Sequence, residues 1–177
     1  KGFEKHLLPV PQMSLYCTKW TDLDDNESYR KFIDESKVSL HTIVPDSELF
    51  ADAEFVLTEL FGEATINVIP KNARKEIIGL YAQFKKNKPS VVHAFHDRLN
   101  VNAGIAAVLA GVPRIVVSTR SVSKHDKEGI NHFKRPVCYK VAYKELLKHS
   151  NVQMYHVSRA ASDSYDSWLD LDDRQKL

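Results

Sequence analysis

The sequence predicts an α/β protein with a Rossmann-like, doubly wound and mainly parallel sheet that is flanked by helices. Residues 89–119 contain a strand, a helix and a second strand within about 30 residues, which is a βαβ unit whose strands must run parallel. The same alternation returns over residues 136–169. The strands are apolar runs of the kind that parallel sheets bury. In such sheets ligands bind at the carboxyl ends of the strands.

The first half of the chain predicts two strands and three helices. Residues 13–20 (MSLYCTKW) and 38–44 (VSLHTIV) are rich in β-branched and aromatic side chains, so each predicts a strand. Between them, residues 29–36 place apolar side chains on one face of a short helix. A capped helix is expected over residues 46–61. A longer one is expected over residues 73–87, where apolar residues recur at helical spacing.

The central segment is the most informative part of the sequence. Residues 90–95 (SVVHAF) predict a short buried strand, and the polar residues 96–100 predict a turn. The small residues 103–110 (AGIAAVLA) then predict a helix. We expect Asn100 or Asn102 to cap its N-terminus.

The alternation of strand and helix continues to residue 169 with a longer loop. A helix is expected after a proline, and a serine is expected to cap the last helix. The elements in order are the strand 114–119, the polar loop 120–135, the helix 136–149, the strand 152–157 and the helix from Ser158 to residue 169.

The composition excludes several classes of protein. Hydrophobic residues make up 43% and charged residues 27% of the 177, which fits a folded domain and excludes disordered or collagen-like chains. The two cysteines, Cys17 and Cys138, are too few for a disulfide framework or a zinc ribbon and favour a reducing cytoplasm. No apolar run approaches the roughly 20 residues of a membrane span. The glycines form neither a Gly-x-Gly-x-x-Gly nor a Walker A motif, which argues against a self-contained NAD enzyme or P-loop ATPase.

Positive charge is concentrated in one stretch of the chain. The whole chain carries 25 basic and 23 acidic residues, and a net charge of +2 is too small to indicate a nucleic-acid partner. Between Arg114 and Lys148, however, nine basic residues accompany only three acidic ones. Such a stretch can hold phosphates or lie on an anionic membrane, with Lys124 and Lys127 as candidate anion-binding residues. A solvated helix face and loop is an equally good interpretation.

The end of the strand 90–95 carries a group of polar side chains. His93, His96 and Asp97 are residue types that bind zinc or iron. Side chains alternate along a strand, however, so positions three apart should face opposite sides, and we expect no metal site. His93 is better explained as a buried histidine bonded to backbone, whereas His96, Asp97 and Arg98 are candidate ligand contacts.

The next strand also ends in polar residues. Arg120 and Ser121 follow it directly, and a guanidinium among hydroxyl groups can bind an anion or a sugar hydroxyl. The alternative is an ordinary loop in which Arg120 pairs with an acidic neighbour. Ser158 and Arg159 begin a helix, where free N–H groups favour anions, although Ser158 is more simply explained as a helix cap.

No nucleophile with an adjacent base stands out in the sequence, and Cys138 is expected in the core. Core packing also explains most of the tryptophans and tyrosines better than ligand stacking does. These residues are Trp20, Tyr139, Tyr143, Tyr155, Tyr165 and Trp168.

Three segments carry a resemblance to a known family. They are residues 89–97 (PSVVHAFHD), 102–121 (NAGIAAVLAGVPRIVVSTRS) and 157–165 (VSRAASDSY). Together they resemble the N-terminal domain of GT-B-fold retaining glycosyltransferases of family 4, as found in bacterial capsule and O-antigen biosynthesis. The resemblance implies that residues 1–169 form the acceptor-side Rossmann-like domain, without its first strand and Gly-Gly loop. Residues 170–177 would then start an interdomain linker to a donor-binding C-terminal domain that this sequence lacks.

The resemblance also implies a function. The chain is expected to be the acceptor-binding domain of a hexosyltransferase of surface polysaccharide (capsule or lipopolysaccharide) biosynthesis, inactive alone and without a cofactor. The nucleotide-sugar donor would bind the absent domain. A lipid-linked saccharide acceptor would bind here, in the cytoplasm or at the inner face of its membrane. By this likeness His96, Asp97 and Arg98 line the acceptor side of the cleft, while Arg120 and Ser121 fall where many members place a cleft histidine.

Three alternatives remain. A GT-B-type nucleotide-sugar epimerase would need the same absent half. A non-catalytic flavodoxin-like binding module usually carries an acidic cluster or a glycine-rich loop after its first strand, and neither is found. A metal-dependent hydrolase requires His93, His96 and Asp97 to converge.

Overall fold

The computed structural model describes residues 12–17, 38–42, 55, 57–59, 62–63, 67, 69–123 and 135–171. The chain divides into two compact units, residues 1–44 and 45–177. In the first unit, β1 (Ser14–Cys17) and β2 (Ser39–Thr42) pair in parallel. The rings of Tyr16 and His41 stack across this pair with centroids 4.9 Å apart. Both predicted strands are thus present, whereas the helix expected over 29–36 lies outside the described residues.

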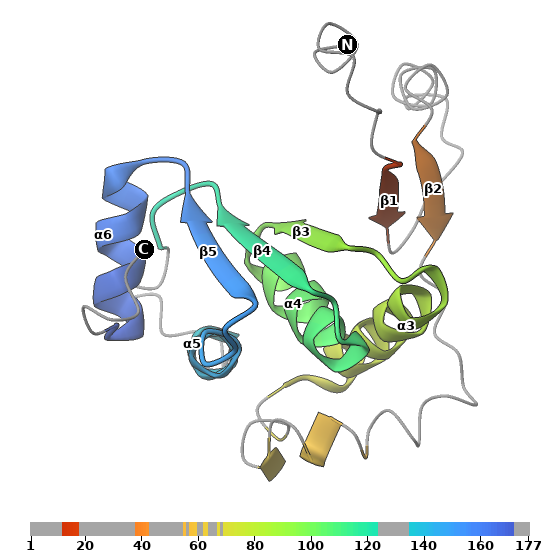
Figure 1. Ribbon diagram of the computed structural model, residues 1–177. Coiled ribbons are helices and arrows are strands. Elements are labelled where there is room, and N and C mark those ends of the chain that lie inside the picture. The colour runs from red at the N-terminus through yellow and green to blue at the C-terminus, as the bar shows by residue number, and fades with distance from the viewer. Residues whose placement is uncertain are drawn as a thin grey trace, which may run out of the picture. The chain divides into compact units, whose positions relative to one another are not determined.

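The second unit contains a three-stranded parallel sheet in the order β3-β4-β5, so the predicted α/β class with a Rossmann-like arrangement is confirmed. All three arrows point the same way in Figure 1. Helices alternate with the strands along the chain. The elements in order are α3 (Lys71–Asn87), β3 (Val91–Phe95), α4 (Asp97–Ala110), β4 (Arg114–Thr119), α5 (Arg135–Leu146), β5 (Val152–His156) and α6 (Arg159–Leu169).

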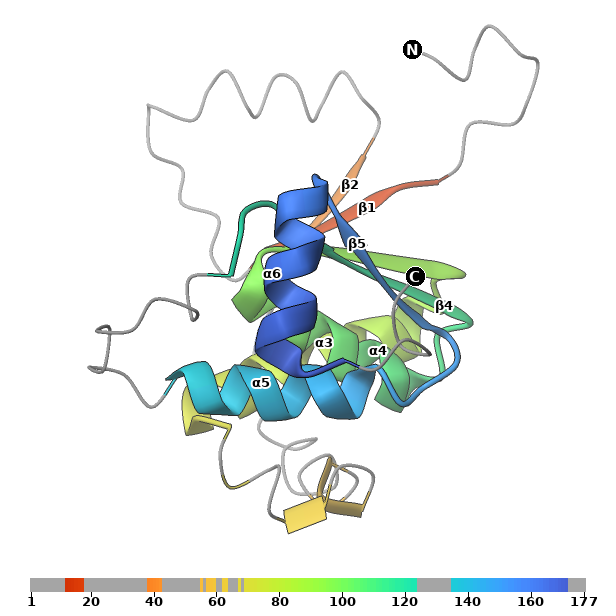
Figure 2. The same cartoon turned by 90° about the vertical axis from the view of Figure 1, so that its left-hand side faces the viewer.

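One face of this sheet forms the core of the second unit. Helices α4 and α5 lie on that face, α3 packs against α4, and α6 stands beside β5 (Figures 1 and 2). Strand residues that point toward the helices are buried, among them Val92, Ile115 and Val117. On β3 the alternate residues Val91 and Phe95 are 47% and 42% exposed. Among the described residues, therefore, β3 has one buried and one exposed face, unlike the fully buried strand that its apolar sequence predicts.

Helix α4 begins earlier than its sequence predicts. Residues 97–100 are helical, so the predicted turn over 96–100 is wrong beyond His96. Asn100 and Asn102 are not N-caps but lie inside the helix, where both are buried. The amide of Asn102 donates to Glu76 Oε2 of α3 at 2.9 Å, and the amide of Asn100 bonds to β4. These bonds to other elements satisfy the asparagine side chains, which removes the usual reason for asparagine to avoid a helix interior.

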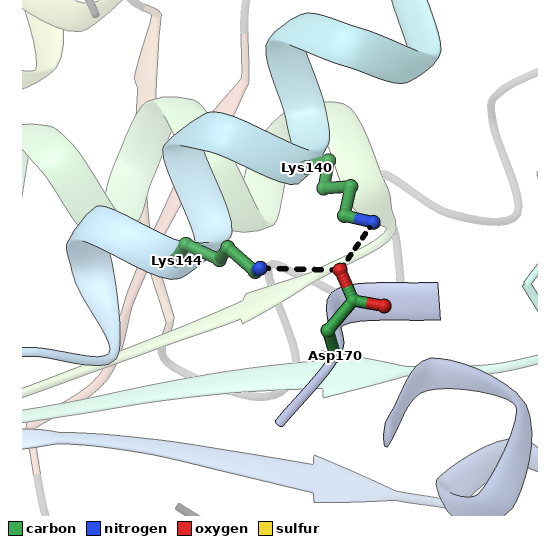
Figure 3. Close-up of polar contacts among 3 residues, drawn as sticks. All are labelled: Lys140, Lys144 and Asp170. Atoms are coloured by element: carbon green, nitrogen blue, oxygen red, sulfur yellow. Dashed lines mark hydrogen bonds and ion pairs between the residues drawn. The ribbon is translucent and has the colours of Figure 1, made fainter. Parts of the chain in front are cut away.

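The C-terminus of α6 is tied to α5 by charge. Asp170 ends α6 in a left-handed conformation, with φ 52°. Its Oδ2 lies 2.7 Å from Nζ of Lys140 and 3.3 Å from Nζ of Lys144, one turn apart on α5 (Figure 3). Hydrogen bonds and attraction from the two lysines hold the pKa of Asp170 below its usual value.

In the part of the chain that the structure describes, no helix is long and apolar enough to cross a membrane.

The contact between α4, α5 and β4 depends on Gly104. A Cβ at this position would lie 3.0 Å from Leu146 Cδ1 and 3.6 Å from Val117 Cγ1. We expect Gly104→Val to lower the free energy of unfolding by about 1–3 kcal/mol, because the added methyl groups force the helices apart. Urea denaturation of the 177-residue chain measures this.

Gly111→Ala is the matched comparison for this prediction. Gly111 has φ 72° and open space around its Cβ position, so only backbone strain opposes the alanine, at a cost of about 1 kcal/mol. A Gly104→Val variant as stable as the wild type would contradict the close-packing argument.

Candidate functional site

A polar pocket lies at the carboxyl ends of β3 and β4, beside α6, where the fold class predicts a ligand. It has a cavity volume of about 220 Å³. This is smaller than the roughly 300–1,000 Å³ of pockets for drug-sized ligands, so it suits one small polar unit. Its lining residues are His96, Asp97, Thr119, Arg120, Ser121 and Tyr165. Four of the five cleft residues predicted from the sequence therefore line one pocket.

Asp97, the first residue of α4, is held by two tyrosines. The hydroxyl of Tyr165 on α6 donates to Asp97 Oδ1 at 2.6 Å, and the hydroxyl of Tyr143 on α5 donates to the same oxygen at 3.0 Å. Burial raises the pKa of both phenols far above the usual value, and the nearby Asp97 carboxylate raises it further. The two hydroxyls therefore stay protonated and act as donors at neutral and moderately alkaline pH.

Asn100 connects this carboxylate to the sheet. Its Nδ2 donates to the carbonyl oxygen of Ser118 and to the hydroxyl of Tyr143, at 3.0 Å each, and its Oδ1 accepts from Ser118 N at 3.3 Å. The Asn100 side chain thus pairs with the backbone N–H and C=O groups of Ser118, as the backbone of a neighbouring strand would. The polar atoms of the Asn100 side chain and the hydroxyl of Tyr143 all have partners, which is the condition for buried polar groups to stabilise a fold.

Two histidines bond to consecutive hydroxyl groups at the end of β4. His93 Nε2 lies 2.6 Å from the hydroxyl of Ser118, and His156 Nδ1 lies 2.8 Å from the hydroxyl of Thr119. Partial desolvation lowers the pKa of both histidines, and the charge of Asp166 partly offsets this effect at His156. His93 was expected to be buried and bonded to backbone; it is instead exposed and bonded to a side chain.

His96 connects β3 to α4 in an unusual backbone conformation. Its φ of 74° and ψ of 143° lie in a region that only glycine adopts freely. Such strain costs on the order of 1–3 kcal/mol and is found most often at functional sites. The position puts the exposed imidazole at the pocket and directs the chain into α4, whose first residue is Asp97.

The other predicted site residues lie elsewhere. Arg98 is not among the pocket residues, since its Nε lies 3.7 Å from Glu76 Oε2. The hydroxyl of Ser158 accepts from Ala161 N at 3.2 Å, which is the predicted helix cap, and Arg159 is exposed at the start of α6. Lys124 and Lys127 lie outside the described residues.

Sequence reasoning did not assign Tyr143, Tyr165 or Asn100 to the site. Tyr143 and Tyr165 are buried as expected of core residues, but their hydroxyl groups also position Asp97. Tyr155, in contrast, is 53% exposed rather than in the core. Asn100 had a usable signal, because an asparagine on the apolar face of a helix needs a hydrogen-bond partner inside the protein unless it caps the helix.

The side chains of the pocket provide both hydrogen-bond acceptors and hydrogen-bond donors. Asp97 supplies a carboxylate, Ser121 supplies a hydroxyl, and Arg120 supplies an exposed guanidinium. In the part of the chain described here, no three His, Cys, Asp or Glu side chains group as metal ligands, and His93, His96 and Asp97 do not converge. The arrangement can bind a polyhydroxylated molecule, with a place for a negative charge at Arg120.

Comparisons with protein-family models, with curated proteins and with solved structures find no significant match for this chain. The chemistry of its pocket is therefore inferred from the side chains themselves.

The strain at His96 predicts that glycine is the more stable replacement. We expect His96→Gly to be about 1 kcal/mol more stable than His96→Ala, because only alanine retains the unfavourable φ. Both variants remove the same exposed side chain, so each is the control for the other in thermal denaturation. Equal stability of the two variants would contradict the strain.

The lowered pKa of His156 predicts a pH dependence of stability. The folded state resists protonation of this side chain, whereas the unfolded chain takes up the proton near pH 6.5. The free energy of unfolding should therefore fall as the pH drops below 6.5 toward the lower folded-state pKa. In His156→Asn, which keeps a hydrogen-bonding group near Thr119, this fall should be smaller.

Urea denaturation of both proteins at about pH 8 and about pH 5.5 separates the titration from the loss of the side chain. At the higher pH, His156 is neutral in both the folded and the unfolded chain. The difference in the free energy of unfolding between wild type and variant at that pH therefore measures the loss of the side chain alone and is the control. An identical pH dependence in the two proteins would contradict the prediction.

Proposed function

We propose that this chain is the acceptor-binding half of a retaining glycosyltransferase that acts in surface polysaccharide biosynthesis, and that its pocket binds the acceptor saccharide. The observation that carries the proposal is the pocket itself. His96, Asp97, Arg120 and Ser121 come from the ends of two different strands and line one cavity. By the resemblance to family 4 glycosyltransferases, His96 and Asp97 are expected on the acceptor side of the cleft, and Arg120 and Ser121 where many members place a cleft histidine.

The chemistry of the lining supports a saccharide. A sugar offers several hydroxyl groups, each a donor and an acceptor, and needs a wall that provides both. Asp97 accepts, Arg120 donates, and the exposed hydroxyl group of Ser121 does either. The volume of about 220 Å³ favours a single sugar unit over a long chain.

Arg120 supports an acceptor that also carries phosphate. Its guanidinium is exposed at the pocket and can bind a phosphate oxygen through two N–H groups. We propose a lipid-linked saccharide, met at the inner face of the cytoplasmic membrane, as the natural acceptor. The nucleotide-sugar donor would be held by a second domain, so this chain alone should bind acceptors without transferring sugar.

Binding of simple glycosides tests the proposal. We expect methyl hexopyranosides, titrated into the ¹⁵N-labelled 177-residue chain, to shift the backbone amide signals of Asp97, Thr119, Arg120 and Ser121. Arg120→Ala should weaken binding of a hexose 1-phosphate by about tenfold, because the charged hydrogen bonds are lost. The unphosphorylated glycoside should be affected much less.

Arg114→Ala is the matched control, since Arg114 is an exposed arginine at the opposite end of the same strand. Two results would contradict the proposal. One is the absence of any shift at the pocket with a panel of hexosides. The other is measurable turnover of a nucleotide sugar by this chain alone.

A further inference from the structure

We propose that Asp97 determines specificity in the pocket and that its Oδ2 accepts a hydrogen bond from a free hydroxyl group of the ligand. Tyr143 and Tyr165 act as positioning residues, because their hydroxyl groups both bond to Oδ1 of Asp97. This inference rests on the proposed saccharide site and goes beyond it. It names which group of the ligand is recognised, and by which atom.

The geometry at the carboxylate is the first argument. A carboxylate oxygen has two lone pairs, and Oδ1 already accepts two hydrogen bonds, at 2.6 Å from Tyr165 and 3.0 Å from Tyr143. Oδ1 is therefore saturated. Oδ2 is engaged by neither tyrosine, and Asp97 lines the pocket. Oδ2 is thus the acceptor that remains for a ligand.

The direction of the hydrogen bonds is the second argument. Asn100 Nδ2 donates to the oxygen of Tyr143, so the proton of that hydroxyl is directed to Asp97 rather than shared with the asparagine. Tyr165 is 2% exposed, and Tyr143 is fully buried. Their rings pack edge to face with centroids 6.2 Å apart, and each also meets Trp168. Donors with so little freedom fix the carboxylate before a ligand arrives, which lowers the entropy cost of binding.

These constraints identify the ligand group. A fixed carboxylate oxygen accepts from a neutral hydroxyl and repels a phosphate or carboxylate placed beside it. The negative charge of a phosphorylated acceptor must then lie toward Arg120. The site therefore selects a saccharide with a free hydroxyl at the position that meets Asp97, and it disfavours analogues in which that hydroxyl is absent or phosphorylated.

The decisive variant is Asp97→Asn. A carboxamide oxygen can still accept from both tyrosines, so the scaffold is kept, but the group that faces the pocket now donates instead of accepting. We expect the affinity for the tightest-binding methyl hexopyranoside to fall at least about tenfold. The preference for this glycoside over its monodeoxy analogues, measured by the same NMR titration, should disappear.

The tyrosine variants test positioning. Tyr165→Phe and Tyr143→Phe each keep a buried ring and remove one hydroxyl from Oδ1. Each should reduce the preference for the hexoside over its deoxy analogue by about threefold to tenfold, although Tyr143 is not among the pocket residues. Loss of stability alone would lower the folded fraction without changing this ratio. Tyr155→Phe and Asp163→Asn, which change exposed residues outside the pocket, should bind as the wild type does.

The outcomes separate this inference from the proposed function. If the wild type binds hexosides and Asp97→Asn or Tyr143→Phe keeps the same preference among deoxy analogues, the inference is overturned and the saccharide site stands. If the wild type binds no hexoside, both fall. Should Asp97→Asn not fold, Tyr143→Phe and Tyr165→Phe decide the question, because unchanged preference in both overturns the inference.

Discussion

The double hydrogen bond to Asp97 Oδ1 is the constraint on which the site depends. It joins the N-terminus of α4 to Tyr143 of α5 and Tyr165 of α6, and Asn100 extends the connection to the end of β4. Elements separated by up to 68 positions in the chain thus meet at one carboxylate oxygen. A buried network of this kind is costly if any member lacks a partner, so it strongly favours one arrangement of these helices over its alternatives.

The residues of the pocket differ in how firmly they are held. Asp97 is fixed by two buried donors, and His96 beside it holds a strained backbone conformation. Arg120 and Ser121, which line the same pocket, are exposed residues that follow β4. A fixed hydrogen-bond acceptor and an exposed cation in one pocket suit a ligand with one invariant hydroxyl and a more variable charged end. This division of roles agrees with the proposed phosphorylated acceptor.

The sequence predicts the location of the site better than its construction. The ends of parallel strands are visible in the sequence, so His96, Asp97, Arg120 and Ser121 could be assigned to a common edge. The hydroxyls of Tyr143 and Tyr165 could not be assigned, because helical spacing reports the apolar face of a tyrosine and not the partner of its oxygen. The early start of α4 was missed for a related reason. Bonds from Asn100 to distant residues stabilise a helical turn that local propensity disfavours.

The ion pairs near the end of α6 reduce the effective positive charge of the basic stretch between Arg114 and Lys148. Lys140 and Lys144 share Asp170, and Lys148 pairs with Glu145 at 2.6 Å, so three of the nine basic residues are paired with two carboxylates and together carry a net charge of +1. At distances beyond a Debye length of about 8 Å such pairs contribute little field. Long-range attraction of an anionic surface therefore comes mainly from the other cations of the stretch, and its dependence on salt should be shallower than a count of lysines and arginines indicates.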